Sequence, residues 1–434
     1  MASTSTAASL PAAVQEASIG AGARYRRLEQ STAARYDADI MPDTKSMVQE
    51  FAWHERYRVA RADEVLTPAL LVYPEIIASN IERTVALLDG EADRWRAHVK
   101  TAKLGYTLGM MTARGVRNFK CATTLELRVA CERGAADVLM AYPVIGANAQ
   151  RTRELSEEFS GVRISVLVEN VAQLRQWRGS RIGIFVDVNP GMNRTGIEQS
   201  HAEEIVGLAQ AIRAHGLEFR GLHYYDGQYG AVAEPERTKH AHEGYERLLG
   251  LVAALEKNGS QVAEVVTAGT PAFPCSISFA GFRGAGFVHR ISPGTIIYCD
   301  ATSQAQLPQE YGYQPAVLVL SRVVSHPRKG MITCDAGHKS VSADAGVPTC
   351  VVAGQPGLAP QGPSEEHLPM NVAPGSQAPA VGQLLYLLPR HICPTVNNFD
   401  HAVLIRNGAI EAIEEVSARG RERPLARVAK LGAD

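Results

Sequence analysis

Residues 182–196 read Ile-Gly-Ile-Phe-Val-Asp-Val-Asn-Pro-Gly-Met-Asn-Arg-Thr-Gly, an apolar run of strand length that leads into a glycine-rich turn. A segment of helical character follows at 201–215, and the next apolar run begins at Gly221. A strand, a helix and a second strand in this order are typical of a βα unit with parallel neighbouring strands. The stretch therefore predicts an α/β fold.

The same rhythm continues on both sides of this stretch. Other apolar or β-branched runs lie at 69–73, 96–99, 119–123, 138–142, 164–168, 265–268 and 295–298, with helical segments such as 124–133 between them. Together they give nine strand candidates, one more than a (β/α)8 barrel needs. We therefore expect such a barrel, with the run near Ala69 either in it or in a neighbouring β-domain. A doubly wound open sheet is the alternative that the rhythm leaves open.

The composition of the chain changes after about Ala305. Glycine and proline become frequent, and short strands are expected at 317–324, 330–336, 384–388 and 402–406, as in an antiparallel β-domain. Residues 354–379 are rich in proline and glycine and are expected to form a lid or covering loop. The predicted organisation is a disordered leader with an N-terminal extension (1–65), a barrel (66–305) and a C-terminal antiparallel β-domain (306–434).

Composition limits the partners and the compartment. The 434 residues carry a formal net charge of −1, which gives no reason to expect nucleic acid or a membrane surface as a partner. The seven cysteines are odd in number and scattered, and no secretory leader precedes them. A reducing, cytoplasmic location is therefore expected.

In a barrel of this kind, chemistry lies at the carboxyl ends of the strands. Lys100 follows the run at 96–99, and burial in a barrel mouth would lower its pKa, as an amine needs to attack a carbonyl group. A surface lysine at the start of a loop is the alternative. The turn after Val188 carries Arg194, suited to a phenolate or phosphate oxygen, and Gly269-Thr270-Pro271 could cradle a phosphate.

A second candidate site lies near the C-terminus, where residues 390–400 read Arg-His-Ile-Cys-Pro-Thr-Val-Asn-Asn-Phe-Asp. In an extended backbone His391 and Cys393 would point the same way and could share a soft divalent metal such as zinc. Two protein ligands leave positions open for water or substrate, as a catalytic metal requires. The alternative is a strand histidine beside a buried cysteine.

These segments together resemble the fold-type III pyridoxal-phosphate enzymes, the group that contains alanine racemase. They are most similar to the branch of D-threonine aldolase and eukaryotic D-serine dehydratase. The similar segments are His98-Val99-Lys100-Thr101, Pro190 to Gly196, Gly221 to Gly227, Ser292-Pro293-Gly294-Thr295, Asp335 to Ser340, Glu365-Glu366-His367, His391 to Asn397 and Val416 to Gly420.

The resemblance implies a role for each candidate residue. Lys100 would bind pyridoxal 5'-phosphate covalently, and His391 and Cys393 would hold a divalent metal, zinc or else manganese. The other implied cofactor contacts are Arg194, His223, Tyr225, Gly269 and Thr270. A homodimer is also implied. The roles of Asp335, His338, Glu366 and His367 stay open.

The implied activity is that of a lyase on a D-3-hydroxy amino acid. The thiol at 393 resembles the dehydratase pattern, so dehydration and deamination of D-serine or D-threonine is the first expectation. Retro-aldol cleavage to glycine and an aldehyde is the alternative. A metal-free racemase, a non-catalytic carrier of the cofactor and a scaffold protein are the less favoured readings.

Departures from the family pattern lie around the expected pocket. Ala102 and Gln228 stand where histidines are usual, and Leu368 stands where glycine is usual. The N-terminal extension is also longer than the family norm. These differences bear on the substrate more than on the cofactor.

Overall fold

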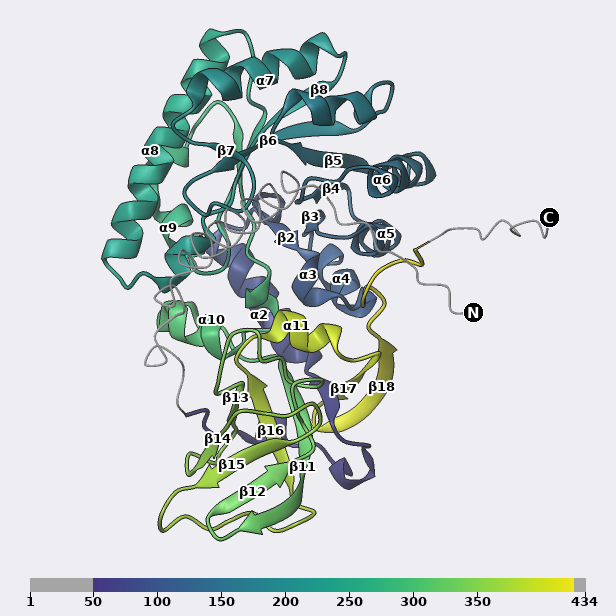
Figure 1. The fold of residues 1–434 in the computed structure, drawn as a ribbon, viewed down its shortest axis with the longest axis vertical. Coiled ribbons are helices and arrows are strands. Elements are labelled where there is room, and N and C mark those ends of the chain that lie inside the picture. Colours follow the sequence, from purple (N-terminus) through teal and green to yellow (C-terminus); the bar gives the residue numbers. More distant parts are fainter. Residues whose placement is uncertain (1–49, 425–434) are drawn as a thin grey trace, which may run out of the picture. The chain divides into compact units, whose positions relative to one another are not determined.

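The computed structural model describes residues 50–424, and the leader expected to be disordered lies outside them. Two nine-stranded sheets organise these residues. The parallel sheet and its helices fill the upper part of Figure 1, and the second sheet fills the lower part. Within residues 50–424, no helix is both long and apolar enough to cross a membrane.

The first sheet is a nearly closed barrel of eight parallel strands, with a ninth, two-residue strand, β7 (Ile197–Glu198), beside β6. The barrel strands are β2 (Arg96–His98), β3 (Asn118–Cys121), β4 (Asp137–Met140), β5 (Arg163–Val168), β6 (Gly183–Asn189), β8 (Glu218–Tyr224), β9 (Glu264–Thr267) and β10 (Val288–Ile291). A parallel bridge between Trp95 and Ile291 brings the two edge strands together. The predicted barrel is confirmed, and the open sheet is wrong.

Helices follow the strands and cover the outside of the barrel (Figure 1). They are α4 (Gly105–Thr112), α5 (Thr124–Glu132), α6 (Ala147–Glu158), α7 (Ala202–Ala214), α8 (Glu236–Lys257), α9 (Phe273–Ser278) and α10 (Ala301–Gln306), while α2 (Pro74–Leu87) precedes the first barrel strand. In α7 the buried residues are Ile205, Leu208, Ala209 and Ile212, one stripe at helical spacing. This stripe explains why the segment forms a helix that packs on the sheet.

Buried charges close one end of the barrel. Arg96 Nε lies 2.7 Å from Glu264 Oε1, and Arg220 Nη2 lies 2.6 Å from Asp137 Oδ2, all near the amino ends of their strands. Above this ionic layer the side chain of Phe185 packs in an apolar layer, which also contains Leu139, Leu167 and Val266. A ligand therefore has access to the lumen only from the carboxyl ends of the strands.

The second sheet is mixed rather than purely antiparallel. Its strands are β1 (Ala69–Val72), β11 (Val317–Arg328), β12 (Met331–Cys334), β13 (Cys350–Val352), β14 (Leu358–Pro360), β15 (Leu368–Val372), β16 (Leu384–Pro389), β17 (His401–Arg406) and β18 (Ala409–Glu415). Strand β1 pairs antiparallel with β11 and parallel with β17. The run near Ala69 thus lies at the centre of this sheet and leaves eight strands for the barrel.

Two sequence expectations fail in this region. The run at 295–298 is not a strand, because Thr295–Ile297 form a 3₁₀ helix, η9, and the last barrel strand is β10. Periodicity cannot separate a short buried helix from a buried strand. In addition, the stretch 354–379 is not one covering loop, because it contains β14 and β15.

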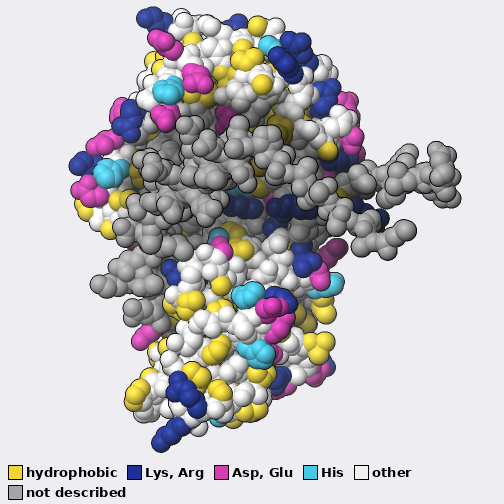
Figure 2. Space-filling view, in the orientation of Figure 1, with side chains coloured by type: hydrophobic (Ala, Val, Ile, Leu, Met, Phe, Trp, Pro, Cys, Tyr) yellow, Lys and Arg dark blue, Asp and Glu magenta, His cyan; other side chains and the backbone are white. Residues whose placement is uncertain are grey.

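Part of the N-terminal extension packs on the second sheet. The ring of Trp53 lies 5.0 Å from that of Tyr386, and the buried hydroxyl of Tyr57 donates a hydrogen bond to the carbonyl of Pro315. On the face shown in Figure 2, basic and acidic side chains are mixed over the surface of both the barrel and the domain of the second sheet. This mixture agrees with the near-zero net charge.

Candidate active site

Lys100 lies where β2 ends. The strand stops at His98, and Lys100 is in the first turn of the short helix α3 (Val99–Ala102), so it follows the strand rather than ending it as predicted. The side chain of His98 accepts a hydrogen bond from the backbone N–H of Lys100 and caps this turn. The side chain of Lys100 is half-buried.

A second lysine, Lys120, which was not predicted as a site residue, also lies at the carboxyl ends of the barrel strands. Lys120 is on β3 in register with His98, and its Nζ lies 3.0 Å from His223 Nε2 and 2.8 Å from Ser292 Oγ. Burial first, and then the charge of Lys100, lower the pKa of Lys120 to about 7. Lys100 and Lys120 therefore lie at the carboxyl ends of the neighbouring strands β2 and β3.

His223 is held between Lys120 and a carboxylate. Its Nδ1 lies 2.7 Å from Asp187 Oδ1, and the other oxygen of Asp187 accepts a hydrogen bond from Thr195. Burial and the charge of Lys120 lower the pKa of His223, against the opposing effect of Asp187. Protonation of the imidazole is therefore disfavoured, and its two hydrogen bonds fix its orientation at the carboxyl end of β8.

Tyr225 follows β8 and forms one wall of the mouth. The guanidinium carbon of Arg194 lies 4.7 Å from the centre of its ring. A Cβ atom at Gly227 would come within 2.5 Å of this ring, and one at Gly269 within 2.9 Å. Only glycine at these two positions leaves room for the ring, so the predicted residues Arg194, Tyr225 and Gly269 are neighbours.

The turn at Gly269 and Thr270 is tied to a buried carboxylate. The N–H of Gly269 donates to Asp226 Oδ1 over 3.3 Å, and the hydroxyl of Tyr245 donates to Asp226 Oδ2 over 2.6 Å. Burial raises the pKa of Asp226 to about 6, although the hydrogen bond from Tyr245 opposes this. The expected phosphate cradle therefore depends more on Thr270 than on the N–H of Gly269.

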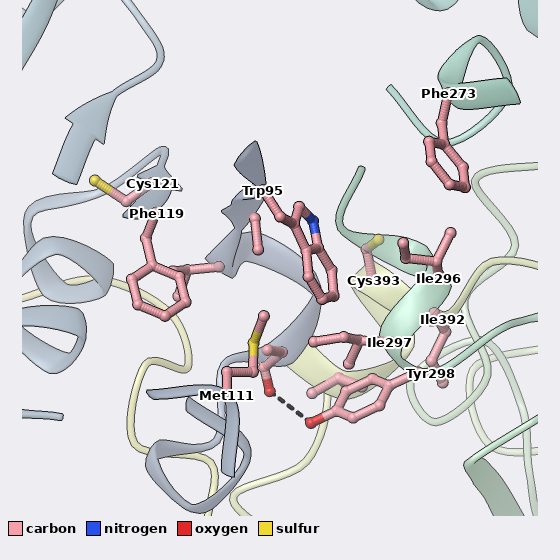
Figure 3. Close-up of a cluster of buried hydrophobic side chains, with 14 of the residues drawn as sticks. Trp95, Met111, Phe119, Cys121, Phe273, Ile296, Ile297, Tyr298, Ile392 and Cys393 are labelled. Atoms are coloured by element: carbon pink, nitrogen blue, oxygen red, sulfur yellow. Dashed lines mark hydrogen bonds between the residues drawn. The ribbon is translucent and has the colours of Figure 1, made fainter. Parts of the chain in front are cut away.

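His391 and Cys393 are close together, but not on a strand as predicted. Strand β16 ends at Pro389, and His391 is the N-cap of helix α11 (Ile392–Asn397), which contains Cys393. Proline at 394 favours this helix start, because its missing N–H falls in the first turn. The thiol of Cys393 lies among buried side chains of η9 and next to Trp95, the residue that precedes β2 (Figure 3).

Each member of this pair has a polar partner. His391 Nδ1 lies 2.6 Å from Asp344 Oδ2, and Cys393 Sγ lies 3.0 Å from the hydroxyl of Thr101. Burial tends to lower the pKa of His391, but Asp344 and Cys393 outweigh it and raise the pKa to about 11. Burial tends to raise the pKa of Cys393, but His391 and Lys100 outweigh it and lower the pKa.

Such a donor set suits a metal ion with open positions. An imidazole and a thiolate are the ligands that zinc prefers, and Asp344 would leave Nε2 of His391 free to coordinate. Within residues 50–424, no group of three or more His, Cys, Asp and Glu side chains is arranged to hold a metal. The protein would therefore supply two ligands and leave the others to water or substrate.

Of the four family landmarks in the second domain, one is held in a network of hydrogen bonds between strands and three are exposed. Asp335 accepts hydrogen bonds from Thr67, Ser321 and the backbone of Arg322, so it joins β11, β12 and the segment before β1. His338, Glu366 and His367 are exposed. Glu366 lies 3.3 Å from Lys339 in an exposed ion pair.

The mouth also fits an anionic, planar cofactor. Its cations are Lys100, Lys120 and Arg194, whereas the carboxylates of Asp187 and Asp226 already accept hydrogen bonds from protein groups. Among the described residues, the buried Oε1 of Gln228 has no hydrogen-bond partner and could accept one from a ligand. A lysine amine, an arginine, a neutral histidine and a glycine turn match the donor set that pyridoxal phosphate requires.

Sequence reasoning missed Lys120, Asp187 and Asp344. For Lys120 a signal existed, because a lysine between Phe119 and Cys121 in a buried strand must point into the barrel or pair with a charge. Asp344 gave no such signal. It lies 47 residues before His391, in the connection between β12 and β13.

Comparisons with known proteins agree with this geometry. The profile of the alanine racemase N-terminal domain matches residues 73–301, and that of a serine dehydratase domain matches residues 316–405. The chain is 28% identical over 374 residues to a D-threonine aldolase from an Arthrobacter species, a match that covers 84% of this chain and 95% of the aldolase.

Solved structures give the same result. The D-threonine aldolase of Filomicrobium marinum superposes with a TM-score of 0.75 at 27% identity, over 82% of this chain and 97% of that chain. D-threo-3-hydroxyaspartate dehydratase from Delftia sp. HT23 superposes with a TM-score of 0.73 at 20% identity, over 83% of this chain and 99% of that chain.

The dehydratase has also been solved with single alanine substitutions of a histidine and of the cysteine two positions later, the latter in the metal-free form. The two domain profiles and these relatives confirm the resemblance predicted from the sequence. Since the first profile spans more than half of its residues, the chain belongs to the family of the alanine racemase N-terminal domain.

Proposed function

We propose that this chain is a pyridoxal-phosphate- and divalent-metal-dependent lyase that acts on a D-3-hydroxy amino acid. The observation that carries the proposal is the contact of Cys393 with Thr101, the residue after Lys100. A metal held by His391 and Cys393 would thus border the lysine that holds the cofactor. The aldolase and dehydratase relatives act on amino acids of this class, which supports the proposal.

In this proposal Lys100 holds the cofactor through its amine, and Arg194, His223 and Tyr225 surround the ring. When bound, the cofactor withdraws electrons from the α-carbon of the substrate, and the metal ion acts as a Lewis acid on the β-hydroxyl. The protein has to present a base to the correct proton and keep the hydroxyl next to the metal. These demands assign the chemistry to Lys100 on one side and to the His391–Cys393 pair on the other.

Dehydration is the first of the two reactions that we propose. Once the amino group of the substrate has displaced Lys100 from the cofactor, the freed amine of Lys100 would take the proton from the α-carbon. Hydroxide would then leave the β-carbon, and the resulting enamine would hydrolyse to a 2-oxo acid and ammonia. The His391-x-Cys393 spacing supports this choice, because the Delftia dehydratase has been solved with a histidine and with the cysteine two positions later replaced by alanine, the cysteine variant in a metal-free form. Zinc is the proposed ion, since thiolate and imidazole are its usual ligands, and manganese is the other candidate.

Retro-aldol cleavage is the second candidate. It needs removal of the hydroxyl proton instead of the α-proton, after which the bond between the α- and β-carbons breaks. A specific observation favours it, since identity to the Arthrobacter aldolase is 28%, against 22% to the Delftia dehydratase. Both reactions use the same pocket, so products must be measured directly.

The deciding experiment incubates the purified full chain with pyridoxal phosphate and either zinc or manganese. D-threonine, D-serine and D-threo-3-hydroxyaspartate are the substrates, with L-threonine as the stereochemical control. Dehydration of D-threonine gives 2-oxobutanoate and ammonia, whereas cleavage gives glycine and acetaldehyde. Absence of all these products from the cofactor- and metal-loaded protein would refute the proposal.

We also propose that the active form is a homodimer, as the family resemblance implies. Sedimentation velocity of the cofactor-loaded protein would test this. A single species with the mass of one chain, at concentrations where the enzyme is active, would contradict the dimer without affecting the proposed reaction.

A further inference from the structure

Lys120 is the feature of the mouth that the proposed function does not yet use. It is 2% exposed at the carboxyl end of β3, between strands β2 and β4 of the barrel. The partners of its Nζ are His223 on β8, across the lumen from β3, and Ser292 directly after β10, two strands away on the other side of β2. The side chain therefore reaches across the lumen to β8, and its Nζ lies 5.8 Å from the ring centre of Tyr225.

The directions of the hydrogen bonds around Lys120 show which of its N–H groups remain free. Nδ1 of His223 faces the carboxylate of Asp187 and carries the ring proton, so Nε2 must accept from Lys120. Ser292 Oγ lies 3.0 Å and 2.8 Å from the carbonyl oxygens of Thr267 and Ala268, and its single proton is donated to them. Ser292 therefore accepts from Lys120 as well. In the protonated form of Lys120, two of the three N–H groups are used in this way, and the third is free to bind a ligand.

Charges around Lys120 indicate what that position would bind. Its two hydrogen-bond partners are neutral, and Lys100 and Arg194 add positive charge nearby. The nearby carboxylates are those of Asp187, behind the His223 ring, and Asp226, which accepts from Tyr245 and Gly269. A buried ammonium with neutral partners is poorly compensated, and an anionic oxygen in the mouth would complete its environment.

We propose that Lys120 is a further ligand-binding residue of this active site, which donates its third N–H to an anionic oxygen of the molecule bound in the barrel mouth. The inference rests on the proposed function, because the bound molecules are then pyridoxal phosphate and an amino acid. Two oxygens have the required chemistry, the phenolate of the cofactor and the carboxylate of the substrate. Lys100 and Arg194 do not take the place of Lys120, because only Lys120 of the three is fixed by hydrogen bonds to His223 and Ser292.

The test compares the wild-type protein with Lys120→Met and Lys120→Gln. Methionine keeps the length and removes both charge and donors, whereas glutamine keeps a donor without the charge. Exposed Lys339→Met, far along the chain in the second domain, is the matched control. Circular dichroism and thermal melting establish that each variant is folded before binding is measured.

Three dissociation constants distinguish whether Lys120 binds the phenolate of the cofactor or the carboxylate of the substrate. They are those of pyridoxal 5'-phosphate, of its analogue without the phenolic oxygen, and of D-alanine for the cofactor-loaded protein, all followed by absorbance. D-alanine has no β-hydroxyl, so it binds without undergoing the lyase reaction. A charge-assisted hydrogen bond lost in Lys120→Met should weaken the affected ligand about 10-fold or more, with a smaller loss in Lys120→Gln.

Weaker binding of pyridoxal phosphate, with equal binding of the analogue to wild type and variant, assigns Lys120 to the phenolate. Unchanged cofactor binding with weaker D-alanine binding assigns it to the substrate carboxylate. If a folded Lys120→Met protein binds all three ligands as the wild type does, the inference is overturned. If the wild type itself does not bind pyridoxal phosphate, the proposed function fails, and that result is visible before any variant is made.

Discussion

The thiol of Cys393 lies 3.0 Å from the hydroxyl of Thr101, which directly follows Lys100 in helix α3. This contact joins the C-terminal domain to the barrel at the point where both carry their reactive groups. Within the barrel, Tyr298 fixes the end of α3, since its hydroxyl donates to the carbonyl of Ala102 over 2.8 Å (Figure 3). Packing therefore holds His391 and Cys393, the proposed metal ligands, close to Lys100, the proposed cofactor lysine, and substitutions can test the two roles separately.

Cys393→Ala should abolish tight metal binding while leaving the absorbance of bound pyridoxal phosphate intact. The thiolate is one of only two proposed protein ligands, whereas Lys100 and the ring contacts are unaffected. Metal analysis by mass spectrometry after dialysis measures this directly. Cys334→Ala, which removes another buried thiol from β12, is the control and should keep its metal. Equal metal content in Cys393→Ala and wild type would contradict the assignment.

Asp344→Asn should weaken metal affinity without abolishing it. Asp344 orients His391 through Nδ1, and loss of such an outer partner reduces metal affinity by about 10- to 100-fold. Competition with a chelator of known affinity gives the value. An affinity within twofold of wild type would show that Asp344 does not orient a ligand.

Lys100→Ala should lose the visible absorbance that a covalently bound pyridoxal phosphate gives. No other amine is expected to replace it, because Lys120 is already bound to His223 and Ser292. Metal content should stay at the wild-type level in this variant. A retained absorbance band, resistant to gel filtration, would place the cofactor on another residue.

Arg96→Met should destabilise the fold by about 3 kcal/mol or more, because it leaves buried carboxylates without their partner. Arg96 is fully buried and pairs with both Asp137 and Glu264. Arg94→Met is the control, since its ion pair with Asp89 is 3.7 Å long and the carboxylate is 82% exposed. That variant should lose at most about 1 kcal/mol. Urea unfolding of the three proteins compares them, and similar midpoints would contradict the prediction.

His289→Gln should make the protein less sensitive to mild acid. Burial, with a smaller effect of Arg94, lowers the pKa of His289 to about 3, and its Nε2 is bonded to Thr267. The unfolded chain binds a proton at this residue below about pH 6.5, so the native state loses stability as the pH falls from there towards 3. At pH 5 this amounts to about 2 kcal/mol.

The measurement for His289 is the free energy of unfolding at pH 7.5 and pH 5. The wild type should lose about 2 kcal/mol more than His289→Gln between these two values. Parallel curves for the two proteins would show that His289 is not the group responsible.

The barrel could be predicted from the sequence because its strands are buried on both faces and read as apolar runs. Strand β10 was not predicted, because two of its four residues, His289 and Arg290, are polar. In the fold Arg290 pairs with the buried Glu264, and His289 forms a hydrogen bond with Thr267. Its charges are satisfied by residues far away in the chain. Apolarity alone could not reveal such a strand.

For the site, motif spacing located Lys100 and the His391–Cys393 pair but not their partners. The expected geometry of the pair was wrong, because a strand-to-helix junction, not an extended strand, brings the two side chains together. Asp187 and Lys120 both contact His223, and these contacts depend on how β3, β6 and β8 curve around the lumen. Curvature of a sheet leaves no local signal in one sequence.

The place of β1 has a consequence for how the protein is made. This strand leaves the ribosome before the barrel, yet its neighbours β11 and β17 are translated only after the barrel is complete. A chain cut short after the barrel would display β1, whose four residues are all buried in the finished protein, as an unpaired apolar strand. The barrel must therefore wait for residues 317–406 before β1 is covered on both sides, and until then this apolar strand is open to pairing with another chain.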